Sequence, residues 1–304
     1  MRTETLAKGV ASGDRNALAR AITLVENDQA GASKLLASLP KRPPRAFVVG
    51  ITGPPGTGKS TLVDKLIGAY RSKGLKVGVI AVDPTSPITG GALLGDRIRM
   101  TGHISDRGVY IRSMASRGWS GGLSRSTARV VQLMDSAEMD VILIETVGIG
   151  QSDIEIVGLA HVVVVVLMPG LGDDIQVSKA GLMEIGDIYV VNKSDLEGAD
   201  QMVVNLLAMV GTLKSRRPLV TKASALKGEG VDKLVESIEH LRTEFRADGS
   251  AMRLKSVRGM LFELARCAVL DDFAKSAEPR LDKLARQVLS GSLTLDEAAR
   301  RMVR

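Results

Sequence analysis

The sequence of 304 residues is poor in cysteine and in long hydrophobic runs. Its single cysteine, Cys267, excludes an internal disulfide framework and a closed cysteine-based zinc site, and it suits a reducing compartment, so we expect a cytoplasmic protein. The longest apolar run, Ile156 to Met168, is shorter than the roughly 20 residues that cross a membrane as a helix, so we expect no membrane partner. Residues 1–10 carry charges with no apolar stretch behind them, and we expect no secretory signal peptide.

Aromatic residues are also scarce, at 3% of the chain, and no lysine and arginine cluster is interleaved with aromatic rings. The formal net charge is +7, but residues 45–249 carry equal numbers of acidic and basic residues. The basic excess therefore lies in residues 1–44 and 250–304. Helix faces in water explain this excess better than a nucleic-acid surface does, so we expect no nucleic-acid partner.

Short β-rich runs alternate with helix-length segments from residue 45 onward. Because these runs are apolar on both faces, they predict an α/β fold, with a mostly parallel sheet covered by helices on both sides and joined by right-handed crossovers. About seven strands are expected, at Ala46–Ile51, Val77–Val82, Val109–Ile111, Val141–Ile144, His161–Leu167, Ile188–Val191 and Pro218–Val220.

Three segments follow from the pattern, in a chain long enough for one large domain with extensions or for two smaller domains. Residues 1–44 are an expected helical extension, with a helical pattern over 3–38 that the linker Lys41-Arg42-Pro43-Pro44 ends. Residues 45–249 hold the expected sheet. Residues 250–304 are helical, and after a break at Ser290-Gly291 a capping box of Thr294 and Glu297 starts a last short helix. Core spacing is found at Leu261, Leu264, Ala265 and Ala268, and again at Leu281, Leu284, Ala285 and Val288.

A phosphate-binding loop is predicted by the run Gly53-Pro54-Pro55-Gly56-Thr57-Gly58-Lys59-Ser60, which fits G-x-x-x-x-G-K-[ST] between an apolar strand and a helical pattern. Glycines let the backbone curl so that successive N–H groups point inward, and the dipole of the following helix also attracts phosphate. Lys59 should reach the β- and γ-phosphates, and the Ser60 hydroxyl should ligate Mg²⁺. We expect the whole run, with Thr61, to contact phosphate.

A second motif, Asn192-Lys193-Ser194-Asp195, directly follows an apolar strand and predicts which base the bound nucleotide carries. The Asp195 carboxylate can accept hydrogen bonds from guanine N1–H and the exocyclic amine, a donor pair that adenine lacks. Alone, N-K-x-D is a weak match that a helix cap also explains, but beside a strand end and after a phosphate loop it favours guanine. Ser224, Ala225 and Leu226 follow the last strand and are candidates for contacts to guanine, although they also suit an ordinary loop.

Three acidic residues, Asp83, Asp96 and Glu145, follow expected strands or lie in the loops after them. A carboxylate at the carboxyl end of a strand near a phosphate loop is the expected direct or indirect partner of Mg²⁺. A solvated strand end or a helix cap explains each of them equally well when it is taken alone.

The motifs together resemble the MeaB/ArgK-type P-loop GTPases, the G-protein chaperones of methylmalonyl-CoA mutase and related adenosylcobalamin-dependent acyl-CoA mutases. The resemblance is close over residues 45–240 and extends in kind to the helical flanks. The segments that carry it are Gly53–Ser60, Val82-Asp83-Pro84, Gly90-Gly91 with Gly95-Asp96, Glu145-Thr146-Val147-Gly148-Ile149-Gly150-Gln151, and Asn192–Asp195.

The resemblance implies a P-loop NTPase that binds GTP or GDP and hydrolyses GTP with Mg²⁺. It implies that Ser60, Asp83, Asp96 and Glu145 gather around the metal ion, and that Gly148 lies at the γ-phosphate. Lys59, Glu145 and Gly148 are then the catalytic residues. Residues 83–99 would be the first switch. An additional switch, from Met168 to Lys179, would report the nucleotide state to the mutase through Gly170, Asp173, Asp174 and Lys179.

The resemblance further implies a homodimer formed through the helical extensions, although an intramolecular helical cap is the alternative use of residues 250–304. The chain lacks the D-x-H-x-x-G pattern of cobalamin-binding domains, so we expect the mutase, and not this chain, to carry the cobalamin. His103, His161 and His240 are far apart in sequence, which disfavours an insertase for zinc, nickel or cobalt.

Two other functions are alternatives to the GTPase chaperone. One is a phosphotransferase of the transport-kinase type, which would pass the γ-phosphate to another acceptor. The other is a nucleic-acid-associated GTPase that uses the basic flanks, and its binding should fall steeply with salt. Because no residue is an obvious group for orienting water, we expect slow intrinsic hydrolysis that a partner accelerates.

Overall fold

The computed structural model describes residues 3–27, 31–83, 100–103, 105–115, 126–146, 152–170, 180–211, 218–247 and 251–303. The chain folds into two compact units, Met1–Gly259 and Met260–Arg304. None of the described helices combines the length and the hydropathy that a membrane span requires.

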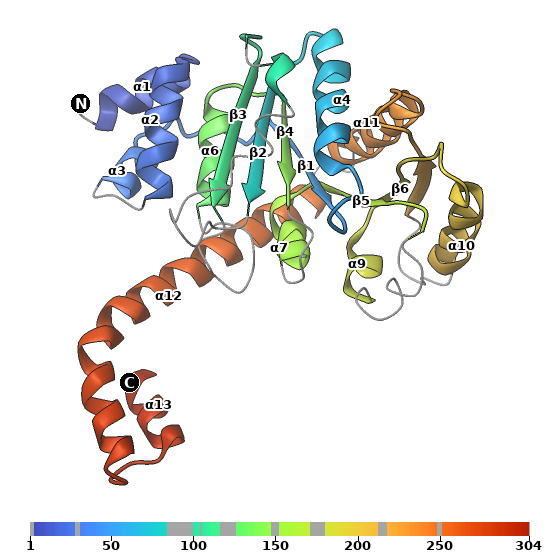
Figure 1. Ribbon diagram of the computed structural model, residues 1–304. Coiled ribbons are helices and arrows are strands. Elements are labelled where there is room, and N and C mark those ends of the chain that lie inside the picture. The colour runs from blue at the N-terminus through green and yellow to red at the C-terminus, as the bar shows by residue number, and fades with distance from the viewer. Residues whose placement is uncertain are drawn as a thin grey trace. The chain divides into compact units, whose positions relative to one another are not determined.

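Seven parallel strands form one sheet in the order β3-β2-β4-β1-β5-β6-β7 (Figure 1). The expected α/β fold, with about seven strands, is confirmed. β1 is central, with β2, β3 and β4 on one side of it and β5, β6 and β7 on the other. Open α/β sheets bind ligands beyond the carboxyl ends of the strands, at the point where the strand order reverses in this way. The strands are β1 (Phe47–Thr52), β2 (Val77–Asp83), β3 (Val109–Ala115), β4 (Val141–Glu145), β5 (Val162–Leu167), β6 (Ile188–Val191) and β7 (Leu219–Lys222).

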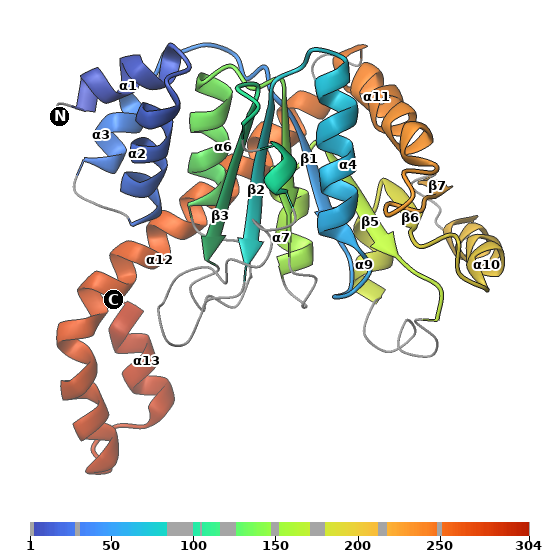
Figure 2. The ribbon, with the colours of Figure 1, turned by 45° about the horizontal axis from the view of Figure 1, so that its top comes forward.

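Helices cover both faces of the sheet because alternate residues of its strands are apolar on each side. Val49 and Ile51 of β1 pack in one core cluster with Leu66 of α4 and Leu234 of α11, and both views show these two helices beside each other (Figures 1 and 2). Helices α6 and α7 cover the other face. The bounds are α4 (Lys59–Ser72), η1 (Thr101–His103), α6 (Thr127–Ser136), α7 (Ser152–Leu159), α9 (Ala180–Ile185), α10 (Ala199–Gly211) and α11 (Val231–Ala247).

The helical pattern over residues 3–38 is correct in type, and the structure divides it into separate helices. Gly13 has a φ of +76°, and the Asp14 carboxylate accepts hydrogen bonds from the N–H groups of Asn16 and Ala17, which starts a new helix. Three helices result: α1 (Thr3–Ala11), α2 (Arg15–Glu26) and α3 (Ala32–Ala37).

The last part of the chain is helical, as expected, in α12 (Ala251–Leu289) and α13 (Leu295–Val303). The predicted capping box is confirmed. The N–H of Glu297 donates to Thr294 Oγ1 at 3.2 Å, and the N–H of Thr294 donates to the Glu297 carboxylate at 2.9 Å. The core spacing is only partly matched by burial, because Leu284 is buried whereas Leu261 is 60% exposed. The three-segment division stays a prediction.

Candidate functional site

The phosphate loop joins the end of β1 to the start of α4, and two of its glycines allow the close approach of neighbouring segments. Gly53 has a φ of +137°, and a Cβ there would lie 2.1 Å from the carbonyl oxygen of Val166. Gly58 has a φ of +87°, and a Cβ there would lie 2.5 Å from Nδ2 of Asn192. A side chain at either position would therefore strain the backbone and push the loop away from β5 or β6.

Lys59 begins α4 and is almost completely buried. Its Nζ donates to the carbonyl oxygens of Gly53 at 2.8 Å and Pro54 at 3.0 Å, while the Thr57 hydroxyl donates to Pro54 at 2.9 Å. A buried ammonium requires acceptors, and phosphate oxygens are stronger acceptors than carbonyl oxygens. The loop therefore holds the lysine among its own carbonyl groups, at the position where phosphate is expected. Pro55 and Gly56 are exposed in the loop, and Thr61 lies in the first turn of α4.

Ser60 and Glu145 meet at the same edge of the sheet. The Ser60 hydroxyl donates to Glu145 Oε1 at 2.7 Å, and both side chains are buried. Register places Glu145 opposite Ile51 of β1, one residue before the strand ends. Hard oxygen donors beside a phosphate loop fit Mg²⁺, which takes few protein ligands and completes its shell with phosphate oxygens and water. Among the described residues no cluster of three or more His, Cys, Asp or Glu side chains could hold a metal ion alone.

The other predicted metal residues are placed less fully. Asp83 is the last residue of β2, and β2 pairs with β4 so that Ala81 aligns with Glu145. Asp96 lies outside the described residues. Sequence reasoning missed a threonine contact beside this site, in which the Thr146 hydroxyl donates to the Thr52 hydroxyl at 2.8 Å.

Asn192 directly follows β6 and bridges two loops. Its Nδ2 donates to the carbonyl oxygen of Thr57 at 2.8 Å, and its Oδ1 accepts the N–H of Ala225 at 3.0 Å. The side chain is buried, and both hydrogen bonds are local to the edge where the strands end. Lys193 has a φ of +55°, which turns the chain away from β6 toward Asp195.

Asp195 lies beside the loop that follows β7. The Ser224 hydroxyl donates to Asp195 Oδ1 at 2.8 Å, and Lys227 Nζ lies 3.5 Å from Oδ2. The Ser224 hydrogen bond is the main cause that holds the pKa of Asp195 below its ordinary value, and the Lys227 charge adds to it. The carboxylate is thus an ionised acceptor at neutral pH. Leu226, a predicted guanine contact, is 84% exposed. Lys227 was not predicted, because no sequence motif includes it.

The switch residues are the least described part of the predicted site. Gly148, Asp173, Asp174 and Lys179 lie outside the described residues. Gly170 is exposed after β5 and has a φ of +81°.

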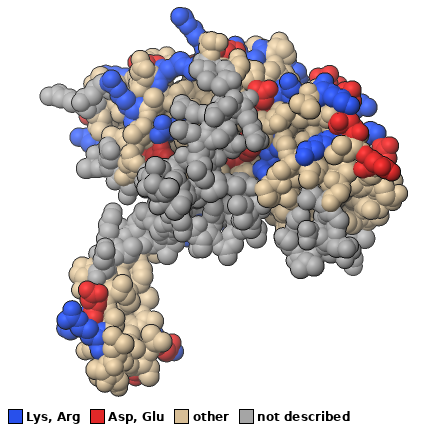
Figure 3. Space-filling view, viewed as in Figure 1, with Lys and Arg blue, Asp and Glu red and all other residues tan. Residues whose placement is uncertain are grey.

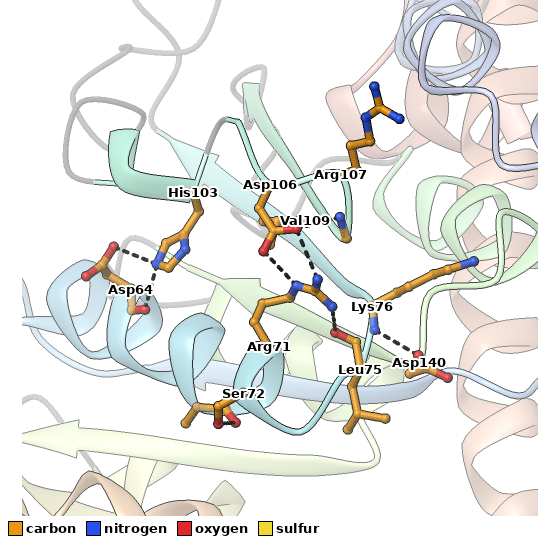
Figure 4. Close-up of polar contacts among 12 residues, drawn as sticks. Asp64, Arg71, Ser72, Leu75, Lys76, His103, Asp106, Arg107, Val109 and Asp140 are labelled. Atoms are coloured by element: carbon orange, nitrogen blue, oxygen red, sulfur yellow. Dashed lines mark hydrogen bonds and ion pairs between the residues drawn. The ribbon is translucent and has the colours of Figure 1, made fainter.

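The helix that follows the phosphate loop is held at two points by the segment before β3 (Figure 4). Arg71 donates to both carboxylate oxygens of Asp106, at 2.8 and 3.1 Å, and this contact is the main cause that lowers the pKa of Asp106. His103 of η1 lies with its Nε2 3.2 Å from the carbonyl oxygen of Asp64 and 3.3 Å from its carboxylate. These contacts hold α4 near its middle, at Asp64, and near its end, at Arg71.

A family model described as the methylmalonyl-CoA mutase-associated GTPase MeaB matches residues 18–278. A Pyrococcus horikoshii protein whose name describes it as a GTPase is 46% identical over 286 residues, covering 92% of this chain and 90% of that protein. The mitochondrial methylmalonic aciduria type A homolog of Mus musculus is 33% identical over 321 residues, covering 97% of this chain and 77% of that protein. GTPase ArgK of Escherichia coli is 36% identical over 257 residues, covering 81% of this chain and 77% of that protein.

Among solved structures, the crystal structure of an LAO/AO transport system kinase matches with a TM-score of 0.73 at 24% identity. The match covers 99% of this chain and 96% of that one. This likeness concerns the fold, and the expected P-loop NTPase fold is confirmed.

Proposed function

Because the chain belongs to the MeaB family of methylmalonyl-CoA mutase-associated GTPases, we propose that it binds GTP, hydrolyses it with Mg²⁺, and serves an adenosylcobalamin-dependent acyl-CoA mutase. In this role the nucleotide state gates cofactor loading and protects or reactivates the mutase. The name of the Mus musculus relative, which refers to methylmalonic aciduria, supports the mutase connection.

The bridge made by Asn192 is the observation that carries the GTP proposal. It joins the phosphate loop, at Thr57, to the loop of Ser224 and Ala225, and Asp195 accepts a hydrogen bond from that second loop. One end of this edge of the sheet has the motif for phosphate, and the other has an ionised carboxylate suited to guanine. A single extended ligand with a base and a phosphate chain fits both ends.

Phosphate binding is proposed for residues 53–61, through Lys59 and through the backbone N–H groups of this segment other than Pro54 and Pro55, which have none. On binding, the Lys59 ammonium would exchange the carbonyl oxygens of Gly53 and Pro54 for phosphate oxygens, at little cost because the group is already buried and oriented. Hydrolysis needs a water in line with the γ-phosphorus and compensation of the developing charge, and Lys59 supplies part of that charge.

Ser60 and Glu145 would hold Mg²⁺, together with Asp83 and Asp96 as the family resemblance implies. The metal ion, when bound, neutralises negative charge on the phosphate oxygens. Gly148 is proposed to contact the γ-phosphate, and Gly170, Asp173, Asp174 and Lys179 to report the nucleotide state. Intrinsic turnover is proposed to be slow until the partner orders these segments.

Self-association through α12 is part of the proposal. Leu254, Val257 and Leu261 are 58%, 40% and 60% exposed, and they follow one another at spacings of three and four residues along the helix. Apolar side chains at these spacings form a seam that a second helix can cover. A second copy of the chain is the proposed occupant.

Neither alternative function gains support. The relatives are named as GTPases, whereas the transport-kinase name belongs to a structure whose likeness concerns the fold. Lysine and arginine side chains are interspersed with aspartate and glutamate over the described part of the face in Figure 3. A nucleic-acid footprint is a stripe of one sign, so this face does not favour nucleic acid.

The test combines phosphate release with capture of the mutase. GTP and Mg²⁺ should give free phosphate, faster when a candidate cobalamin-dependent mutase is added, and a non-hydrolysable GTP analogue should make the two proteins co-elute. Lys59→Ala should lower turnover about a hundredfold, because the phosphate charge loses its partner. Lys65→Ala, on the exposed side of the same helix, is the control. Equal turnover in wild type and Lys59→Ala, or no response to any such mutase, would contradict the proposal.

A further inference from the structure

The carboxylate of Asp195 has a different protein partner at each oxygen, a hydrogen-bond donor at one and a cation at the other. Oδ1 accepts the Ser224 hydroxyl at 2.8 Å, and Oδ2 lies 3.5 Å from the ammonium of Lys227. Lys227 belongs to the loop after β7, whereas Asp195 belongs to the loop after β6. The ammonium therefore links the two loops that border the proposed base site.

The two donors leave the acceptor positions that guanine needs. An ionised carboxylate has about four acceptor positions, two on each oxygen. Ser224 takes one of these positions on Oδ1 and Lys227 pairs with Oδ2, and a backbone N–H also stabilises the carboxylate, so part of the acceptor capacity remains for further donors. Guanine offers a pair of adjacent donors, N1–H and the exocyclic amine, and one can go to each oxygen.

We propose that Lys227 is a positioning residue for guanine recognition, which holds the Oδ2 side of Asp195 and compensates its charge when a base covers it. This inference rests on the proposed binding of guanine nucleotides. Asp195 carries the recognition, and Lys227 acts through it.

The contribution of Lys227 should appear in binding and not in folding. The side chains of Lys227 and Asp195 are 52% and 28% exposed in the free chain, and exposed ion pairs add little to stability because water screens them. A bound base removes water from the carboxylate, and the attraction between the two charges then increases.

The experiment measures GDP affinity by titration calorimetry for the full chain and its variants. Lys227→Met should weaken GDP binding about three- to fivefold, within the range of partly exposed ion pairs. Lys227→Arg should restore the affinity, because the charge remains. Lys222→Met is the matched control. Lys222 is the last residue of β7, its side chain is 56% exposed, and it pairs with Asp200 and not with Asp195. This variant should bind GDP as the wild type does.

A second arm uses Asp195→Asn, with xanthosine diphosphate as the ligand. A neutral amide gives the ammonium no charge to compensate, so adding Lys227→Met should change the affinity less than twofold. Unchanged or tighter GDP binding by Lys227→Met overturns the inference, as does an equal loss in the Asp195→Asn background. A wild type that prefers ADP to GDP overturns the proposed function itself.

Discussion

The side-chain nitrogen of Asn192 donates to the carbonyl oxygen of Thr57 at 2.8 Å, although the two residues are 135 positions apart in sequence. The same side chain accepts the N–H of Ala225 at 3.0 Å. Both contacts are buried, so one amide group fixes the phosphate loop relative to the loop after β7.

Removal of this amide should loosen both loops. Asn192→Ala leaves a buried carbonyl and a buried N–H without their partner, which costs about 2 kcal/mol in the free energy of unfolding. GDP affinity should fall about tenfold, since the two ends of the site lose their alignment. Urea denaturation and calorimetry measure the two effects. Asn205→Ala, which removes an exposed asparagine on α10, should leave both unchanged. Equal values for the two variants would contradict this account of Asn192.

Asp195→Asn should change the base preference. The amide offers a donor where guanine also has one, so GDP affinity should fall about a hundredfold. The affinity for xanthosine diphosphate should rise relative to the affinity for GDP. Competition between the two nucleotides gives the ratio directly. Asp200→Asn, at an exposed pair with Lys222, is the control and should keep the wild-type ratio. Retained preference for GDP in Asp195→Asn would remove Asp195 from recognition.

The contact between Arg71 and Asp106 should make the free energy of unfolding depend on pH in the acidic range. Hydrogen bonds from Arg71, and from the N–H of Gly108, lower the pKa of Asp106 from 3.8. A group with a lowered pKa in the folded state adds stability above its unfolded value, and this contribution is lost as the pH falls through the lowered pKa. Asp106→Asn should therefore cost about 1 kcal/mol at pH 7, and the difference from wild type should shrink below pH 4. Denaturation at pH 7 and pH 3 tests this, and a pH-independent difference would contradict it.

Leu261→Lys should weaken self-association. The change places a charge at one end of the proposed seam, and the dissociation constant of the dimer should rise at least about tenfold. Light scattering over a range of concentrations measures the mass. Val204→Lys is matched for exposure on α10, at 58%, and should leave the mass unchanged. A wild type that stays monomeric at every concentration would refute the proposed dimer.

Local patterns explain how much of the fold could be predicted from the sequence. All seven strands overlap the apolar runs that predicted them, because apolar β-rich residues carry a signal within the strand itself, although β3 continues to Ala115 and β7 to Lys222. The Thr294–Glu297 box was predictable for the same reason, as its partners are three residues apart. The break near Gly13 was not predicted.

Contacts between distant segments were beyond the sequence. The motifs predicted Asn192 and the phosphate loop separately, but not the hydrogen bond that joins them. Thr52 and Thr146 meet only because β1 and β4 are neighbours in the sheet. Lys227 is one exposed lysine among many until the fold brings it to Asp195. The exposure of Leu261 was likewise missed, since helical spacing indicates an apolar face but not what covers it.

Titration of the nucleotide-free protein with GDP and with ADP, in the presence of Mg²⁺, tests the central claim most directly. A carboxylate with two guanine donors to satisfy should bind GDP at least about a hundredfold more tightly than ADP. Equal affinity, or tighter binding of ADP, would contradict guanine recognition by Asp195.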